Sequence, residues 1–84
     1  MTPEYHLDHH QTKALRAFWH KSRRQIVACT KVDVVARSGL SAENVTAAMW
    51  ELSLRELVSA KSRSNLQIYD LTPKGRSMLA EVMQ

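Results

Sequence analysis

The side chains that could do chemistry are few in this chain of 84 residues, and their spacing does not assemble a reactive site. His6, His9 and His10 lie near the N-terminus, where a His-x-x-His pair on a helix could bind a metal ion. His6 precedes the first predicted helix, however, and no carboxylate or thiol completes a set of ligands. Cys29 is a single cysteine, which excludes an internal disulfide and favours a small buried residue over a redox sensor. We therefore predict no metal site.

Catalysis is equally unsupported. The serine and histidine residues show no spacing that assembles a catalytic triad, and there is no Gly-rich loop to hold a phosphate. A chain of this size also has little volume left for an active-site pocket once its core is filled. We predict a binding module that is not an enzyme and needs no cofactor.

Charge indicates the kind of partner. Lys and Arg number 12 against 8 Asp and Glu, a formal net charge of +4 at pH 7. The excess lies early and late: residues 13–24 hold five basic side chains and no acidic one, whereas residues 41–60 are net acidic. Such a distribution favours a polyanion, with a solvated basic face as the alternative.

The hydropathy pattern argues against a membrane protein. No apolar run approaches the roughly 18 residues that a membrane span needs. The first ten residues also lack the basic-then-apolar layout of a signal peptide. We expect a cytoplasmic protein.

The order of elements follows from periodicity and from helix caps. Residues 1–7 lack periodicity and are expected to form a flexible arm, which leaves residues 8–84 as one domain. Apolar residues at three- and four-residue steps predict a first helix over 8–24, and a short strand is expected at 25–29. Thr30 with Asp33 predicts the start of a helix over 31–37, with Val32, Val35 and Ala36 turned inward and Gly39 at its end.

The second half of the chain predicts one long helix, a hairpin and a last helix. Ser41 caps a helix over 42–55, whose apolar line comprises Val45, Ala48, Met49 and Leu52. Two β-prone runs, 57–61 and 66–71, flank a polar turn and predict a hairpin. Thr72 and Pro73 then begin a helix that turns Met78, Leu79 and Val82 inward.

Two stretches resemble a known family. The segment VVARSGLSAENVTAAMWELSLRELV is similar to the helix-turn-helix core of winged helix-turn-helix domains. Tyr69 to Gly75 reads YDLTPKG and resembles the Y-x-L-T-x-x-G motif of MarR-like and PadR-like transcriptional regulators. The resemblance covers roughly the DNA-binding core of such regulators. It implies an α+β fold with a three-helix core, a two- or three-stranded wing and a C-terminal helix.

The resemblance also implies a function, namely duplex DNA binding in transcription regulation, as a homodimer. The helix over 42–55 would enter the major groove while the wing, 57–71, touches the backbone. The implied base-reading residues are Ser41, Ala42, Glu43, Asn44, Thr46 and Ala47. The implied backbone contacts are Lys31, Lys61 and Arg63, which would neutralise phosphates without reading sequence.

Three departures from the family bear on function. The full MarR-like regulators have additional terminal helices that form their dimer, for which we expect this chain to have no room. Glu56 stands where such regulators usually have glycine before the wing, in a turn that costs a non-glycine residue about 1 kcal/mol. The helix over 42–54 contains no basic residue, and its outer line carries Ala47, Trp50 and Leu54. If exposed, that apolar stripe suits a protein partner. A winged-helix protein-interaction module is therefore the second hypothesis.

Overall fold

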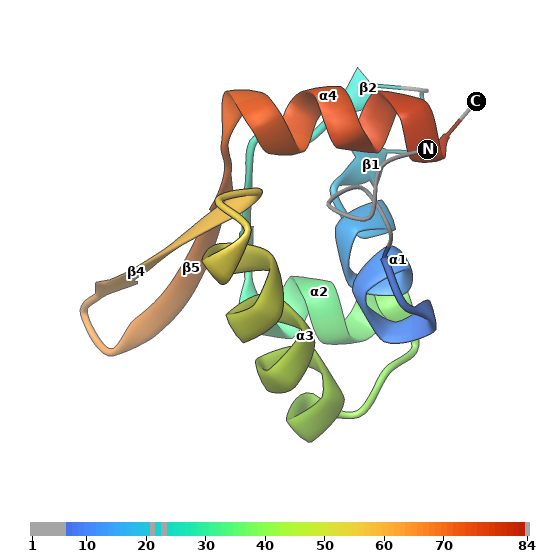
Figure 1. The fold of residues 1–84 in the computed structure, drawn as a ribbon. Helices are drawn as coiled ribbons and strands as arrows, with labels where there is room; N and C mark the ends of the chain where they lie inside the picture. The colour runs from blue at the N-terminus through green and yellow to red at the C-terminus, as the bar shows by residue number, and fades with distance from the viewer. Residues whose placement is uncertain (1–6, 21, 23, 84) are drawn as a thin grey trace.

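Three helices share one hydrophobic core, a β-hairpin projects from one side of it, and a fourth helix closes the top (Figure 1). The computed structural model describes residues 7–83 except Lys21 and Arg23, so the arm expected at 1–7, with its His6, falls almost wholly outside the described residues. The helices are α1 (His9–Arg16), α2 (Lys31–Ser38), α3 (Ala42–Leu54) and α4 (Pro73–Val82). The strands are β1 (Trp19–His20), β2 (Arg24–Gln25), β3 (Ala28–Thr30), β4 (Val58–Arg63) and β5 (Leu66–Leu71).

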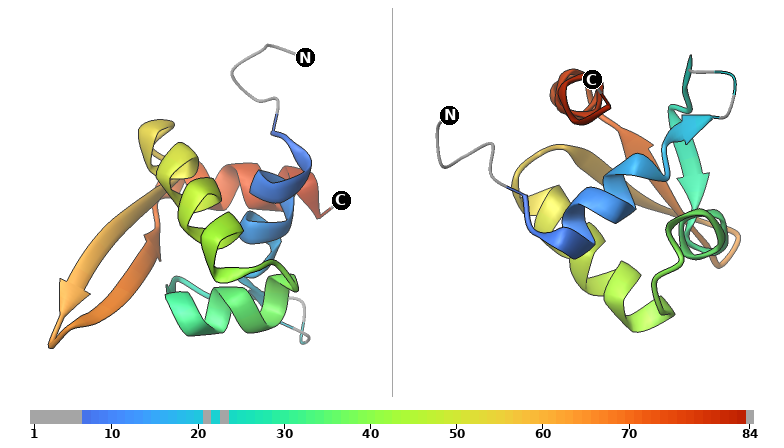
Figure 2. Two further views of the ribbon diagram at one scale, coloured as in Figure 1. Left: turned by 90° about the horizontal axis from the view of Figure 1, so that it is seen from below. Right: turned by 90° about the vertical axis from the view of Figure 1, so that its right-hand side faces the viewer.

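The strands form two antiparallel sheets. β5 lies between β3 and β4, with Cys29 opposite Tyr69 and Ala60 opposite Tyr69 on the other side. β1 and β2 pair separately as a short ribbon. Figure 2 shows the long β4–β5 hairpin extending away from the helices. This is the winged-helix fold, and the predicted α+β class is confirmed, with a three-stranded wing.

The first helix is shorter than predicted. It ends at Arg16 rather than at residue 24, and Phe18 N–H then donates to Leu15 O at 3.1 Å in a tighter turn. The chain folds back from there, because Ile26 N–H donates to Phe18 O at 2.6 Å and Trp19 pairs with Gln25. Phe18 is fully buried by this reversal. The prediction of a longer helix was wrong because the apolar residues keep a helical spacing through the turn, and no Gly or Pro marks the end of the helix.

The second helix has the predicted ends but a different buried face. Thr30 and Asp33 form a capping box, and Gly39 ends the helix in the left-handed region at φ 73°. Val34 is the fully buried residue, whereas Val32 is 71% exposed and Ala36 is exposed too. The predicted inward set of Val32, Val35 and Ala36 is therefore wrong except for the half-buried Val35. Four small apolar residues within five positions fit more than one helical face, and packing against α1 and α3 selects Val34.

The third helix matches the prediction closely. Ser41 Oγ accepts the N–H of Asn44 at 3.1 Å, and Val45, Ala48, Met49 and Leu52 are all buried.

The hairpin turn is tighter than predicted, because β4 extends to Arg63 and only Ser64 and Asn65 connect the strands. Both turn residues have positive φ, 51° and 65°, as a two-residue type I′ turn requires.

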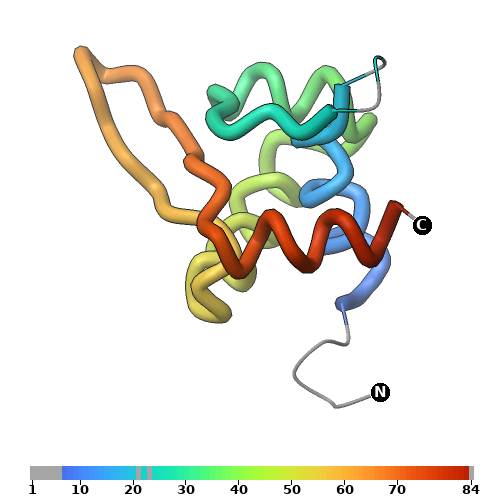
Figure 3. Tube along the Cα trace, turned by 90° about the horizontal axis from the view of Figure 1, so that it is seen from above, coloured from blue at the N-terminus to red at the C-terminus, as the bar shows by residue number. Residues whose placement is uncertain are grey.

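The junction between α3 and the wing is held by the start of α4. Glu56 takes the left-handed conformation at φ 61°, and the N–H of Leu57 donates to Leu52 O at 2.9 Å, which completes a Schellman motif without glycine. The Thr72 hydroxyl donates to Glu56 O at 2.6 Å, and Thr72 N–H donates to Leu57 O at 3.1 Å. Figure 3 shows α4 running from this junction across to α1, which it contacts.

Within the described residues, no helix combines the length and apolar content needed to cross a bilayer.

Gly75 is required at this junction. A Cβ at residue 75 would come within 1.9 Å of the Leu57 carbonyl oxygen, whereas a Cβ at Gly39 would meet nothing within 4 Å. We expect Gly75→Ala to lower the free energy of unfolding by about 3 kcal/mol through overpacking. The matched variant Gly39→Ala should cost only about 1 kcal/mol, for its left-handed backbone. Urea unfolding followed by circular dichroism measures both, and equal losses would contradict the packing argument.

Burial of the Cys29 thiol makes the free energy of unfolding depend on pH in the alkaline range. Burial raises the pKa of the Cys29 thiol, an effect that the nearby Arg37 partly offsets, and burial also raises the pKa of Tyr69. Below about pH 8 the thiol holds its proton in both the folded and unfolded states. As the pH rises further, the unfolded thiol ionises first, so stability is lost as the pH rises toward the raised folded value. We expect the urea concentration at the midpoint of unfolding to fall as the pH rises above about 8.5. In Cys29→Ser, which has no thiol to ionise, the fall over the same pH range should be smaller.

Candidate nucleic-acid interface

The outer face of α3 is open to solvent over its first half. Five of the six predicted base-reading residues are exposed there: Ser41, Ala42, Glu43, Thr46 and Ala47. The Thr46 hydroxyl donates to Ala42 O at 3.0 Å, so it offers an acceptor more readily than a donor. The first turn thus presents short side chains and one carboxylate on a surface that a groove could receive.

Asn44 lies differently from the other five. Its side chain is half-buried and shares a small depression with Asp8, His10, Gln11 and Glu51, on the side of α3 that faces α1. In that depression the buried Gln11 amide donates to Glu51 Oε2 at 2.8 Å. Asn44 therefore lies at the edge of the outer face, beside α1, rather than at its centre.

The three predicted phosphate contacts differ in their readiness to bind an anion. Arg63 is exposed at the end of β4, next to the turn at the wing tip. Lys61 forms an ion pair with Asp70, its Nζ 2.5 Å from Oδ2, so part of its charge is already neutralised. Lys31 is half-buried at the start of α2 and borders an apolar groove of about 350 Å³ that also includes Val32 and Ala42.

An apolar stripe runs along the same face of α3. Trp50 is 64% exposed and Leu54 is 66% exposed, with Ala47 exposed one turn before Trp50. Trp50 also borders a groove of about 120 Å³ between α3 and the wing, with Ala60 and Gln67 on the wing side. The stripe is therefore surface and not core. Gln67 was not among the predicted residues, because its place in the groove follows from the pairing register and the angle of the hairpin.

The basic segment at 13–24 does not form one helix face. Arg16 ends α1, whereas Arg24 lies in β2, and Lys21 and Arg23 lie outside the described residues. Arg37 donates from Nη1 to Ala17 O and to Cys29 Sγ, both at 3.3 Å. Sequence reasoning missed Arg37, because its neighbours come from segments far apart in the chain. Within residues 7–83, apart from Lys21 and Arg23, no three His, Cys, Asp or Glu side chains gather to hold a metal.

Comparison with solved structures gives the class of protein that shares this fold. BpsR of Bordetella bronchiseptica, whose DNA binding is regulated by 6-hydroxynicotinic acid, superposes with a TM-score of 0.78 at 25% identity. The match covers 98% of this chain and 61% of that one, so the chain spans less than two thirds of BpsR. TubR of Bacillus thuringiensis serovar israelensis pBtoxis, bound to 24 bp of tubC, gives 0.78 at 19% identity over 92% of this chain and 82% of TubR.

A third structure extends the comparison. Sso10a-2, a DNA-binding protein of Sulfolobus solfataricus, gives a TM-score of 0.71 at 14% identity over 99% of this chain and 76% of that one. No protein-family profile and no curated protein matches the sequence. The chain is a winged-helix domain whose structural neighbours are DNA-binding proteins.

The exposure of Trp50 leads to a stability prediction. We expect Trp50→Ala to change the free energy of unfolding by no more than about 0.5 kcal/mol, because the indole contributes little to the core. Met49→Ala, at the neighbouring buried position, should cost about 3 kcal/mol. Urea unfolding compares the two variants, and native tryptophan fluorescence of Trp19→Phe should be red-shifted. Equal destabilisation by both substitutions would place Trp50 in the core.

Proposed function

We propose that this protein is a small MarR-like transcriptional regulator that binds duplex DNA through α3, the start of α2 and the wing. The observation that carries the proposal is the open first half of α3 beside a projecting hairpin with Arg63 at its tip. This arrangement presents a helix for the major groove and a flanking cation for the backbone. TubR, with the same fold, is a protein bound to DNA. In this proposal residues 8–84 act as one domain, preceded by an arm at 1–7, in the cytoplasm.

Base reading by α3 depends on contacts other than arginine or lysine. Glu43 can accept a hydrogen bond from the cytosine amino group, and the methyl group of Ala47 can contact the methyl group of thymine. Trp50, one turn further along, extends the apolar contact. The side-chain amide of Asn44 can bind adenine at two atoms once it turns out from its position beside α1. Such a surface distinguishes bases by shape and apolar contact, while affinity comes from cations elsewhere.

The wing and α2 supply those cations in the proposal. Arg63 and Lys31 each neutralise a phosphate, and Lys61 does so in competition with Asp70. Two copies on a palindromic operator would set their α3 helices about 34 Å apart, one turn of DNA. Sedimentation of the protein with a duplex would give the stoichiometry, and one copy per half-site would support the homodimer.

Binding to a random-sequence duplex tests the proposal directly. Fluorescence anisotropy should detect binding at low salt. The logarithm of the association constant should then fall linearly with the logarithm of the salt concentration. Arg63→Ala should weaken binding to all sequences alike and lower the salt slope by about one. Lys61→Ala should have a smaller effect, and Asp70→Asn should strengthen binding because it releases Lys61 from its ion pair.

Arg24→Ala is the matched control for these variants. It removes the same charge from β2, which lies beside α4 and away from the wing tip and α3 (Figure 1). Its duplex affinity should stay close to that of the native protein. Undetectable binding at low salt, or binding without a salt slope, would contradict the proposed function.

The exposed apolar stripe favours a second candidate, a protein-interaction module that uses Ala47, Trp50 and Leu54. Exposed apolar residues rimmed by charge are typical of interfaces, and aromatic side chains often dominate their binding energy. Trp50→Ala separates the candidates, since it should reduce sequence preference if α3 reads bases. Duplex affinity and preference that both stay unchanged would favour the protein interface.

A further inference from the structure

The groove between α3 and the wing is small and carries no charge of its own. Its volume is about 120 Å³, below the roughly 300 Å³ at which small-molecule sites begin, so it suits one chemical group rather than a whole ligand. Helix α3 and the wing both contribute to its walls, which include Thr46, Trp50, Ser53, Ala60, Gln67 and Tyr69. Among the described residues that line the groove, none is acidic or basic.

Strand alternation explains why the cations of the wing lie outside this groove. Ala60 lies opposite Tyr69 across β4 and β5, and both border the groove, so this face of the hairpin points toward α3. Lys61 and Arg63 follow Ala60 by one and three residues, so their side chains leave β4 from the opposite face. The groove and the cations of the wing therefore contact different parts of any ligand.

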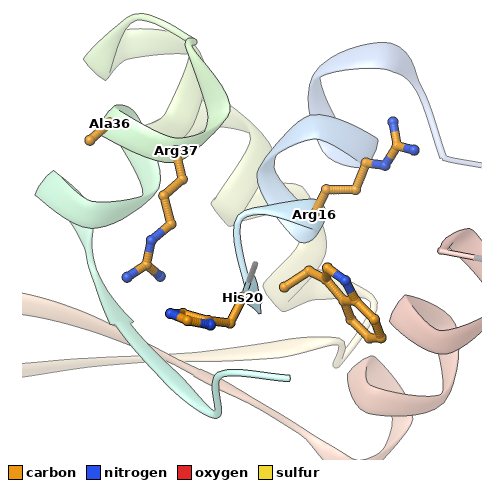
Figure 4. Close-up of a pocket in the computed structure, with 5 residues that line it drawn as sticks. Arg16, His20, Ala36 and Arg37 are labelled. Carbon is orange, nitrogen blue, oxygen red and sulfur yellow. The ribbon is translucent and has the colours of Figure 1, made fainter. Parts of the chain in front are cut away.

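The basic side chains of α1 and α2 lie elsewhere. Figure 4 shows Arg37 turned from α2 toward the ring of His20, while the Arg16 guanidinium points away from both. These three side chains border a separate pocket between α1, β1 and α2, and none of them lines the groove beside the wing. An anion in that groove would be bound by neutral donors.

Tyr69 is the first of these donors. Its side chain is 2% exposed and forms no hydrogen bond with any residue of the described chain. Every fully buried side-chain nitrogen or oxygen among the described residues does have a partner, so the Tyr69 hydroxyl reaches solvent, and the groove is the opening that Tyr69 borders. Burial raises the pKa of Tyr69, so the hydroxyl keeps its proton and can donate it.

Gln67 is the second donor. It lies two residues before Tyr69 on the same face of β5, and its exposed amide makes no hydrogen bond to another described residue. On the opposite wall, the hydroxyls of Thr46 and Ser53 donate to carbonyl groups of their own helix, at 3.0 and 2.7 Å. Their protons are already used, so the wing supplies an amide and a phenol that can both point at one acceptor.

We propose that this groove holds one backbone phosphate of DNA through the Tyr69 hydroxyl and the Gln67 amide, without a cation. The proposal rests on the proposed function, because a duplex with α3 in its major groove and the wing on its flank passes one strand between them. Neutral side chains often bind phosphate oxygens in such complexes. They neutralise no charge and release no counterion, so this contact adds affinity that salt does not weaken.

Tyr69→Phe is the sharpest test, because it removes one oxygen that has no partner in the free protein. The urea midpoint should therefore stay close to that of the native protein. Affinity for a random-sequence duplex should fall about tenfold, as expected for a hydrogen bond to a charged group, with the same salt slope as the native protein. A salt slope that falls as it does in Arg63→Ala would indicate a displaced wing and would overturn the proposal.

Gln67→Leu tests the second donor at an exposed position, where folding is not at risk. It should weaken duplex binding at least about threefold, again without a change in salt slope. Ser59→Ala is the matched control, because Ser59 precedes Ala60 and its hydroxyl leaves the outer face of β4. Its affinity should equal that of the native protein. Native affinity in Tyr69→Phe, or equal losses in Gln67→Leu and Ser59→Ala, would overturn the proposal.

Sequence dependence distinguishes a phosphate from a base. The loss caused by Tyr69→Phe should be the same on an all-A·T duplex and on an all-G·C duplex, because a phosphate contact carries no sequence information. A loss confined to one duplex would place the hydroxyl at a base edge and overturn the proposal. Failure of the proposed function has a different result, since the native protein itself would then show no salt-dependent binding to duplex DNA.

Discussion

The carbonyl group of Leu57 is the contact on which the position of the wing depends. It accepts Thr72 N–H at 3.1 Å, it shares the single proton of the Thr72 hydroxyl, 3.0 Å away, with Glu56 O, and Gly75 packs directly over it. These contacts join the end of α3, the first residue before β4 and the first turn of α4 at one point. Since β4 begins at the next residue, they set the angle at which the hairpin leaves the core. The strained Glu56 is retained here because its neighbours over-determine its conformation.

Because the hairpin is fixed relative to α3, it holds a cation at a set distance from a helix that has no basic residue of its own. Cations stand at the periphery, on the wing at Arg63 and at the start of α2 at Lys31, and the helix between them is apolar and acidic. Peripheral cations fix position and supply salt-dependent affinity, which base contacts do not need to supply. The ion pair between Lys61 and Asp70 follows from the strand pairing, because Lys61 lies opposite Ile68 and Asp70 opposite Ser59, which makes the two charged residues diagonal neighbours across β4 and β5.

Local signals made most of the fold predictable, and long-range contacts decided the rest. Thr30, Ser41 and Thr72 cap their helices as expected because a cap depends on residues three positions away. The end of α1 depends instead on Phe18 O receiving Ile26 N–H, a contact that no helical period encodes. For the candidate site, the helical wheel put Ala47, Trp50 and Leu54 on the outer line of α3, but whether Trp50 is exposed depended on how the wing packs and was left open. The turning of Asn44 toward α1 and the gathering of Arg37 with His20 did not follow from the wheel, since both require the packing of separate segments.

α2 lies between the candidate DNA interface and the segment that follows α1, and its contacts fix both of its ends. Lys31 in its first turn shares a groove with Ala42 at the start of α3, and Arg37 in its last turn donates to Ala17 O and to Cys29 Sγ. The helix is short and is capped at both ends, by Thr30 and by Gly39. Val34, fully buried midway between them, resists displacement because a close-packed core tolerates little translation.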